Sequence, residues 1–194
     1  MEAKSVYFEK PGIENTETVL KLVKERAAQL GIKTVVLAST TGYTAVKAVE
    51  ILKGFKIIAV TLATGAHRPD DQPFKVENRK IVEAKGGIIL TATQPFSGLD
   101  RALHLEINPI PTHYTSGDLV STTFRIFSQG MKVATEIAAM ATDAGLVRTD
   151  EDIISIGGTS RSRGGADTAI VIQPSNVRRF FNTKVKEIIC KPRL

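Results

Sequence analysis

The sequence feature that most constrains the fold is a series of short, mostly apolar runs rich in valine and isoleucine. They lie at residues 34–38 (TVVLA), 56–61 (KIIAVT), 87–90 (GIIL), 152–156 (DIISI) and 168–172 (TAIVI). Strands that are apolar at every position, rather than at alternate ones, are typical of a parallel sheet covered on both faces. Because helical patterns separate the first three runs, they predict right-handed βαβ units and an α/β fold.

The stretches between the runs have the apolar periodicity of helices. Predicted helices lie within residues 14–31, 44–53, 72–87, 99–103 and 119–145. We expect Asn15 or Thr16 to cap the first helix and Gly31 to end it. The last is expected to be interrupted or kinked near Gly130, since glycine is a poor helix former.

The connection between the fourth and fifth runs decides the direction of the fifth strand. This glycine-rich loop is too short to carry a crossover helix, so we predict that the fifth strand is antiparallel to the fourth. If the first three strands are laid outward and the fourth returns to the other side of the first, the strand order is 3-2-1-4-5. The chain ends, residues 4–9 and 185–192, are candidate edge strands.

The composition is that of one globular domain over residues 1–194, with 42% hydrophobic and 24% charged residues. No apolar run approaches the roughly 20 residues needed to span a bilayer. The amino terminus lacks the apolar segment of a signal peptide. The single cysteine, Cys190, cannot form an intramolecular disulfide, and we expect it to be a buried residue of the carboxyl-terminal tail. We therefore expect a cytoplasmic protein that does not contact a membrane.

The net charge of +6 is concentrated near the carboxyl terminus, where residues 176–194 hold six basic residues and one acidic one. Nucleic-acid-binding segments often interleave basic and aromatic residues repeatedly, and this stretch does not. We interpret it as a solvated basic edge and do not expect nucleic acid as a partner.

In open α/β sheets, ligands bind beyond the carboxyl ends of the strands where the strand order reverses. Here that point lies between the first and fourth strands, which end in STTGYT (residues 39–44) and GGTSRSRGGADT (157–168). The two turns richest in glycine and hydroxyl groups should therefore face one crevice.

The chemistry of these turns suits an anion such as phosphate. A helix amino terminus offers unpaired N–H groups, hydroxyls add donors, and we expect Gly42 to let a ligand approach the backbone. In the second turn, glycines permit positive φ angles and arginines offer guanidinium groups. With residues near the same edge, the candidate binding residues are Ser39, Thr40, Thr41, Gly42, Tyr43, Thr44, Thr64, His67, Lys132, Gly157, Gly158, Thr159, Arg161, Arg163, Gly164 and Gly165.

Simpler interpretations exist for each turn. Thr41 or Thr44 can cap a helix without binding anything, and the arginines can be solvated. The first turn lacks the lysine and spacing of a P-loop, and no G-x-G-x-x-G follows the first strand, which argues against ATP or NAD binding by those motifs. The three histidines are scattered, so no metal site is predicted.

Three residues have individual expectations. His67 leaves the second strand and is expected in the crevice wall. Lys132 reaches an anion if its helix begins near the crevice, and is otherwise a solvated helix lysine. Tyr43, rather than Tyr114, is expected to stack on an aromatic ring of the ligand.

Two segments resemble the carboxyl-terminal α/β domain of pyruvate kinase: residues 34–61 (TVVLASTTGYTAVKAVEILKGFKIIAVT) and 152–172 (DIISIGGTSRSRGGADTAIVI). The similarity runs in order over about residues 15–172 and implies a three-layer α/β/α domain with a mixed sheet of order 3-2-1-4-5, the fifth strand antiparallel. In allosterically regulated pyruvate kinases the first loop holds a phosphate of a sugar bisphosphate effector. The resemblance therefore implies a phosphate site at residues 39–44.

The segments FSGLDRA, GMKVATEIAAMATDAGLV and KEIICKPR are similar to stand-alone archaeal and bacterial proteins built from this domain. That resemblance implies flavin mononucleotide (FMN) in the same crevice. The barrel that carries the metal, phosphoenolpyruvate and the catalytic lysine of pyruvate kinase has no counterpart here, so kinase activity is not implied.

Three functions follow as hypotheses. The first is binding of a phosphorylated small molecule, most specifically FMN. The second is an enzyme, either a flavin-dependent oxidoreductase or one acting on a phosphorylated metabolite, with His67 or Lys132 handling the proton. The third is a regulatory or interaction module that acts through an interface between copies of the chain in a homo-oligomer.

Overall fold

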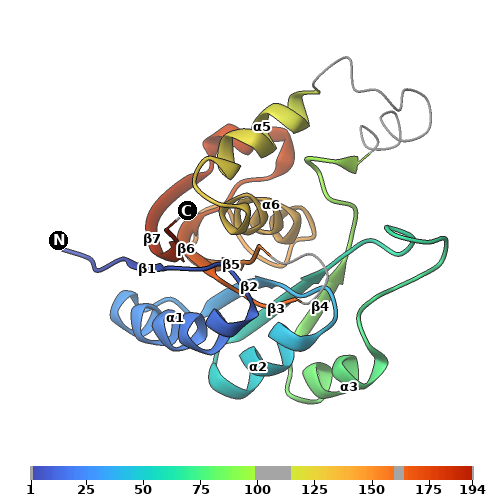
Figure 1. Cartoon of the computed structure of the whole chain (residues 1–194), viewed down its shortest axis with the longest axis horizontal. Coiled ribbons are helices and arrows are strands. Elements are labelled where there is room, and N and C mark those ends of the chain that lie inside the picture. Colours follow the sequence, from blue (N-terminus) through green and yellow to red (C-terminus); the bar gives the residue numbers. More distant parts are fainter. Residues whose placement is uncertain (1, 99–114, 160–163, 194) are drawn as a thin grey trace.

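The computed structural model describes residues 2–98, 115–159 and 164–193, and its strands form one mixed sheet (Figure 1). The order across the described sheet is β1-β7-β6-β5-β2-β3-β4. The strands are β1 Val6–Phe8, β2 Thr34–Ala38, β3 Lys56–Thr61, β4 Ile88–Thr91, β5 Ile153–Gly157, β6 Thr168–Gln173 and β7 Lys184–Pro192.

The five predicted inner strands are β2 to β6, and their order 3-2-1-4-5 is confirmed. β6 pairs antiparallel with β5, whereas β2, β3, β4 and β5 pair in parallel. The whole sheet differs in detail because both chain ends add strands beyond β6. β7 pairs antiparallel with β6, and β1 pairs in parallel with β7.

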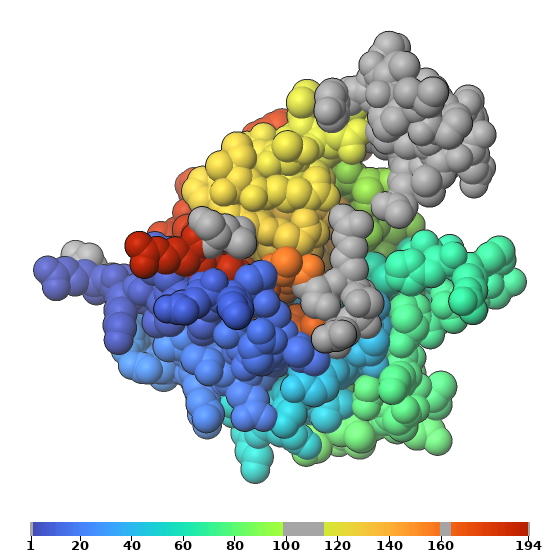
Figure 2. Space-filling model, in the orientation of Figure 1, coloured from blue at the N-terminus to red at the C-terminus, as the bar shows by residue number. Residues whose placement is uncertain are grey.

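Helices cover both faces of the sheet, which makes the predicted three layers (Figure 1). The helices are α1 Thr16–Leu30, α2 Tyr43–Ile51, α3 Val76–Ala84, α5 Ser116–Arg125 and α6 Gln129–Asp143, with short 3-10 segments η1 Ile13–Asn15 and η3 Val177–Asn182. α1, α2 and α3 lie on one face, α6 lies on the other, and α5 packs outside α6. The two helical layers occupy opposite sides of the space-filling view (Figure 2).

Alternate side chains of the strands supply the two cores. In β2, Val35 and Leu37 pack with the buried faces of α1 and α2, whereas Val36 packs with α6. All three are fully buried. A strand in this position must therefore be apolar throughout, which is the pattern that predicted a sheet covered on both faces.

The α6 backbone lies unusually close to the sheet because glycines face each other across the contact. A Cβ atom on Gly157 of β5 would lie 2.1 Å from the carbonyl oxygen of Gly130, and one on Gly130 would lie 2.2 Å from Thr168 Oγ1. Ser155 Oγ also donates to the carbonyl of Ala134 at 2.6 Å. These contacts fix the height of α6 above the strands.

The predicted break in the long helix is confirmed, but it lies before Gly130. α5 ends at Arg125, and Ser128 caps α6 by accepting a hydrogen bond from Met131 N at 2.9 Å. The glycine instead serves the close packing of α6 on the sheet. The predicted helix at 99–103 lies outside the described residues.

Two smaller expectations have clear outcomes. Cys190 is buried, as expected for a cysteine in a strand. Asn15 is the N-cap of α1, one of the two predicted alternatives, but its side chain makes no capping hydrogen bond, and the Thr16 hydroxyl donates back to Ile13 O at 2.6 Å. None of the helices in the described ranges is long and apolar enough to cross a membrane.

Candidate functional site

The two turns predicted to face one crevice do meet. Gly165 N donates to Thr44 Oγ1 at 3.2 Å, and the neighbouring Ala166 N donates to Thr16 Oγ1 at 3.1 Å. A Cβ on Gly164 would lie 3.4 Å from Thr41 Oγ1. The turn after β2 and the loop between β5 and β6 therefore form one surface at the carboxyl edge of the sheet.

The hydroxyl groups of the first turn have different roles. Ser39 is buried and accepts from Ala45 N at 3.2 Å, so it satisfies an amide of the first turn of α2. Neither Thr41 nor Thr44 caps the helix, because Gly42 is the N-cap. The hydroxyls of Thr40 and Thr41 make no hydrogen bond to any residue that the structure describes.

The structure gives Gly42 a packing role. Its φ of 93° requires a glycine, but the space beside it is occupied by the chain rather than open to a ligand. A Cβ there would lie 2.5 Å from the Cβ of Asn78 and 2.8 Å from Phe74 Cε1. Asn78 Nδ2 also donates to the carbonyl of Thr41 at 2.9 Å. Gly42 therefore lets α3 pack against the turn.

The glycines of the second loop divide into two pairs. Gly164 and Gly165 have the predicted positive φ angles, 72° and 100°. The prediction is wrong for Gly157 and Gly158, which lack side chains because neighbouring backbone approaches them: a Cβ on Gly158 would lie 2.3 Å from Gly165 O. The predicted Arg161 and Arg163 lie outside the described residues.

A buried aspartate, which the sequence analysis missed, closes the base of this loop. Asp167 Oδ2 accepts from Thr159 N at 3.0 Å, and its Oδ1 accepts from Thr168 Oγ1 at 2.9 Å. Asp167 is fully buried. Thr159 Oγ1 is also buried and has no hydrogen-bond partner in the described part of the chain. An acidic residue immediately before a buried strand was the available sequence signal for Asp167.

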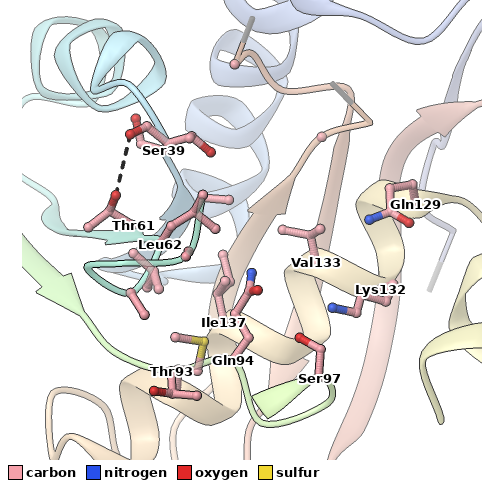
Figure 3. A pocket seen from close by; sticks show the side chains of 18 of the residues that line it. Ser39, Thr61, Leu62, Thr93, Gln94, Ser97, Gln129, Lys132, Val133 and Ile137 are labelled. Carbon is pink, nitrogen blue, oxygen red and sulfur yellow. Dashed lines mark hydrogen bonds between the residues drawn. The ribbon is translucent and has the colours of Figure 1, made fainter. Parts of the chain in front are cut away.

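Beside the turns, a cavity of about 310 Å3 lies between the carboxyl ends of β2, β3 and β4 and the first half of α6 (Figure 3). Its apolar wall includes Leu62, Val133 and Ile137, while Ser39 and Thr61 lie on the sheet side. This volume is in the range of small-molecule sites, which combine apolar walls with a few polar groups.

The cavity separates the predicted residues into two sets. Those in its wall are Ser39, Thr40, His67, Lys132, Gly158, Gly164 and Gly165. Those not lining it are Thr41, Gly42, Tyr43, Thr44, Thr64, Gly157 and Thr159. Tyr43 therefore cannot form a stacking wall of this cavity as it stands, and Tyr114 lies outside the described residues.

Lys132 is neither solvated nor isolated. Its side chain is 6% exposed and forms an ion pair with Glu136, one helical turn along α6. Glu136 is fully buried, and its Oε1 accepts from Phe96 N at 3.1 Å. The ammonium group also lies 5.6 Å from the centroid of the Phe96 ring. Glu136 thus joins α6 to the turn after β4. Its spacing of four residues from Lys132 was the sequence signal for the pair.

Two glutamines missed by the sequence analysis hold other parts of the cavity wall. Gln72 Oε1 accepts from Thr61 Oγ1 at 3.2 Å, and its Nε2 donates to Leu62 O at 2.9 Å. Gln72 thereby fastens the loop that carries His67 to the end of β3. On α6, Gln129 Oε1 accepts from Arg125 Nε at 2.8 Å. Nothing in the sequence pattern distinguishes these glutamines from surface residues.

The site has no arrangement suited to a metal ion among the residues described. No group of three or more His, Cys, Asp or Glu side chains comes together there. His67 lies in the cavity wall, but it is an exposed loop residue.

A comparison with models of protein families identifies one that covers most of the chain. A family model described as "Pyruvate kinase, alpha/beta domain" matches residues 17–172. Solved structures with similarity include two of pyruvate kinase from Cryptosporidium parvum, both 14% identical, with TM-scores of 0.37 and 0.36. The matches cover 76% of this chain but 21% and 22% of those chains. The chain thus spans about a fifth of the length of the pyruvate kinases it matches.

Proposed function

The chain belongs to the pyruvate kinase alpha/beta domain family, and from this premise we propose that it binds a phosphorylated small molecule, most specifically FMN, at the carboxyl edge of its sheet. The observation that carries the proposal is the meeting of the two turns at the mouth of the cavity, where Gly165 N bonds to Thr44 Oγ1. The proposal needs both an anion site and room for the rest of the ligand beside it.

The anion site is the amino terminus of α2. Helix amino termini carry unpaired N–H groups and partial positive charge, which stabilise a phosphate. The hydroxyls of Thr40 and Thr41 add two donors that no described residue uses. Gly164, opposite Thr41, leaves the space between the turns without a side chain.

The cavity suits the remainder of FMN. Leu62, Val133 and Ile137 offer an apolar surface for a flat ring system, and the amides of Gln94 and Gln129 can hydrogen-bond to its polar edge. The ring would lie against aliphatic side chains, since Tyr43 does not line the cavity. Bound FMN would supply reversible electron transfer, whereas the side chains named here bind and orient it.

The test is to measure binding by the purified chain and by a Thr41→Val variant. We expect yellow colour or a rise in Tm with FMN or sugar phosphates, since a ligand of the folded state raises apparent stability. Thr41→Val should weaken FMN binding about tenfold, because it removes a hydrogen bond to a charged group. Thr122→Val, at an exposed threonine of α5, is the matched control.

Two results would count against the proposal. If neither FMN nor any sugar phosphate stabilises the chain, the cavity does not bind this class of ligand. If the chain binds FMN and Thr41→Val binds it equally well, the phosphate does not lie at the amino terminus of α2.

A catalytic function is the second candidate, favoured by the position of Lys132. A buried lysine in a cavity wall, beside a fully buried carboxylate, is a suitable proton-handling group for a flavin-dependent oxidoreductase or another enzyme of a phosphorylated metabolite. His67 is the other candidate, from the opposite loop. Turnover of reduced cofactor by the FMN-loaded chain distinguishes this function from binding alone.

The third candidate is an interaction module that forms a homo-oligomer. Its support is exposed apolar surface at the end of α5 and on η3: Ile126, the residue after α5, is 80% exposed, and Phe181 of η3 is 88% exposed. Phe181 also packs edge-on against Phe180 at 5.8 Å, so it is held at the surface.

A further inference from the structure

We propose that the α6 side of the cavity is a second subsite, which takes an acceptor-rich group, such as paired ring carbonyls or a carboxylate, at the end of the ligand away from its phosphate. The inference rests on the proposed function and specifies the kind of ligand. Gln129, Lys132 and Ser97 lie on this side of the cavity, across from Ser39 and Thr61 (Figure 3).

The charges of the cavity wall are the first reason. Among the residues described, the charged or titratable side chains that line it are those of Arg125, Lys132 and His67, and no Asp or Glu is among them. Glu136 neutralises Lys132 from behind the wall, where it is fully buried. Arg125 therefore leaves the α6 side with a net positive charge, which favours anionic or acceptor-rich groups over cations.

The orientation of Gln129 is the second reason. A guanidinium can only donate, so the Gln129 atom that faces Arg125 Nε at 2.8 Å must be the amide oxygen. The oxygen of this amide is therefore already bonded to Arg125, and the NH2 group is the part of Gln129 that is left to bind a ligand. An amide held this way discriminates in favour of a hydrogen-bond acceptor.

The third reason is that the turn after β4, which also lines this side of the cavity, is held in place by α6. Glu136 holds Phe96 N at 3.1 Å, and Ser97 N donates to Gln94 O at 3.2 Å within the same turn. The Gln94 amide and the Ser97 hydroxyl therefore line the cavity from a fixed turn rather than from a loose loop. Fixed donors and acceptors lose little conformational entropy on binding, which favours specific recognition.

The three parts of the cavity together define a class of compound. A phosphate fits the α2 end, an apolar body fits against Val133 and Ile137, and an acceptor-rich edge fits the donors of α6. The pyrimidinedione edge of a flavin is one such group, and so is a carboxylate on a phosphorylated acid. A sugar phosphate without such an edge would use only the first part.

The test separates the two ends of the cavity with three probes: FMN, riboflavin, which lacks the phosphate, and ribitol 5-phosphate, which lacks the ring. Calorimetric affinities are measured for the unaltered chain and for Gln129→Leu and Gln129→Glu. Gln129→Leu should weaken FMN and riboflavin about three- to tenfold, the effect of losing one hydrogen bond, and leave ribitol 5-phosphate unchanged. Gln129→Glu can still accept from Arg125 but presents no donor, so riboflavin should weaken at least as much.

The matched control is Gln29→Leu. Gln29 Oε1 accepts from Arg26 Nη1 at 2.7 Å, so this variant breaks the same kind of contact on an exposed helix away from the cavity. It should change none of the three affinities. Thr41→Val should show the reciprocal pattern, with FMN and ribitol 5-phosphate weakened and riboflavin unchanged.

The results that overturn the subsite differ from those that overturn the proposed function. If Gln129→Leu weakens all three probes equally, or weakens none of them, the α6 side does not recognise the ring edge. If the unaltered chain binds no probe, the proposed function fails and the subsite fails with it. A flavin absorption spectrum that shifts on binding to the unaltered chain, but less with Gln129→Leu, supports the subsite independently of affinity.

Discussion

The substitution Gly157→Ala adds one methyl group and should push α6 away from the sheet. The backbone of Gly157 does not have a positive φ, so alanine can adopt its conformation without strain. The added Cβ, however, would lie 2.1 Å from Gly130 O, whereas ordinary contacts begin at 3.4 Å. Backbone cannot turn aside as a side chain can, so α6 must move by about 1.3 Å, the difference between those distances.

This displacement should be costly because α6 covers one of the two cores. Val36, Ile58, Ile153 and Ile170 beneath it are all fully buried. Overpacking of a close-packed core costs about 1–3 kcal/mol, and a backbone clash belongs at the upper end, so we expect about 3 kcal/mol. For a chain of this length that loss lowers Tm by roughly 6–12 °C.

Gly31→Ala provides the matched control. Its Cβ would meet nothing within 4 Å, but its φ of 69° is unfavourable for alanine, so it measures backbone strain without a clash. We expect a loss of about 1 kcal/mol. Urea unfolding gives the free energies, and hydrogen exchange should show faster opening of the first turn of α6 in Gly157→Ala. If Gly157→Ala is no less stable than Gly31→Ala, the contact with Gly130 does not set the position of α6.

Two further predictions concern other parts of the molecule. Burial raises the pKa of Cys190 to about 12, so this thiol should resist alkylation at pH 8 until the chain unfolds; rapid labelling of the native chain would contradict this. The thiol of the unfolded chain ionises near pH 8.5, so below that pH the contribution of Cys190 to the free energy of unfolding is constant. From pH 8.5 toward pH 12 this contribution should fall by up to about 1.4 kcal/mol per pH unit, because only the unfolded thiol loses its proton there. The Cys190→Ala variant should lack this decline. If copies of the chain associate through α5 and η3, Phe181→Ser should lower the mass of the particle measured by light scattering. Val76, 67% exposed on the other side of the sheet, is the control, and Val76→Ser should not change the mass. If the unaltered chain is an oligomer and Phe181→Ser leaves its mass unchanged, this interface is excluded.

The inner sheet could be predicted from the sequence because each step depends on local patterns and general rules of chain connection. Runs such as residues 57–60 (IIAV) have no polar position that could face water, so they must be buried strands. A loop as short as 158–167 permits only an antiparallel return to β6. From these facts the meeting of the two turns also followed, since it is a consequence of strand order.

The walls of the cavity could not be predicted in the same way. Glu136 lies among alanines on α6, and only its packing against the turn that contains Phe96 makes it a buried link between two elements. Gln129 looks like any polar residue at the start of a helix until Arg125 orients its amide. Such roles depend on partners from separate elements or from across a helix break, which periodicity does not specify.

The glycines show most directly which features the sequence determines and which the tertiary structure determines. The sequence alone determined that turns rich in glycine and hydroxyl residues follow the first and fourth inner strands, and therefore where a ligand site could form. Only the tertiary structure decided what fills the space beside those glycines: Gly42 admits Asn78 of α3, and Gly157 admits the backbone of α6. The physical reason is that a missing side chain creates space, and which atoms fill that space depends on how distant parts of the chain pack together.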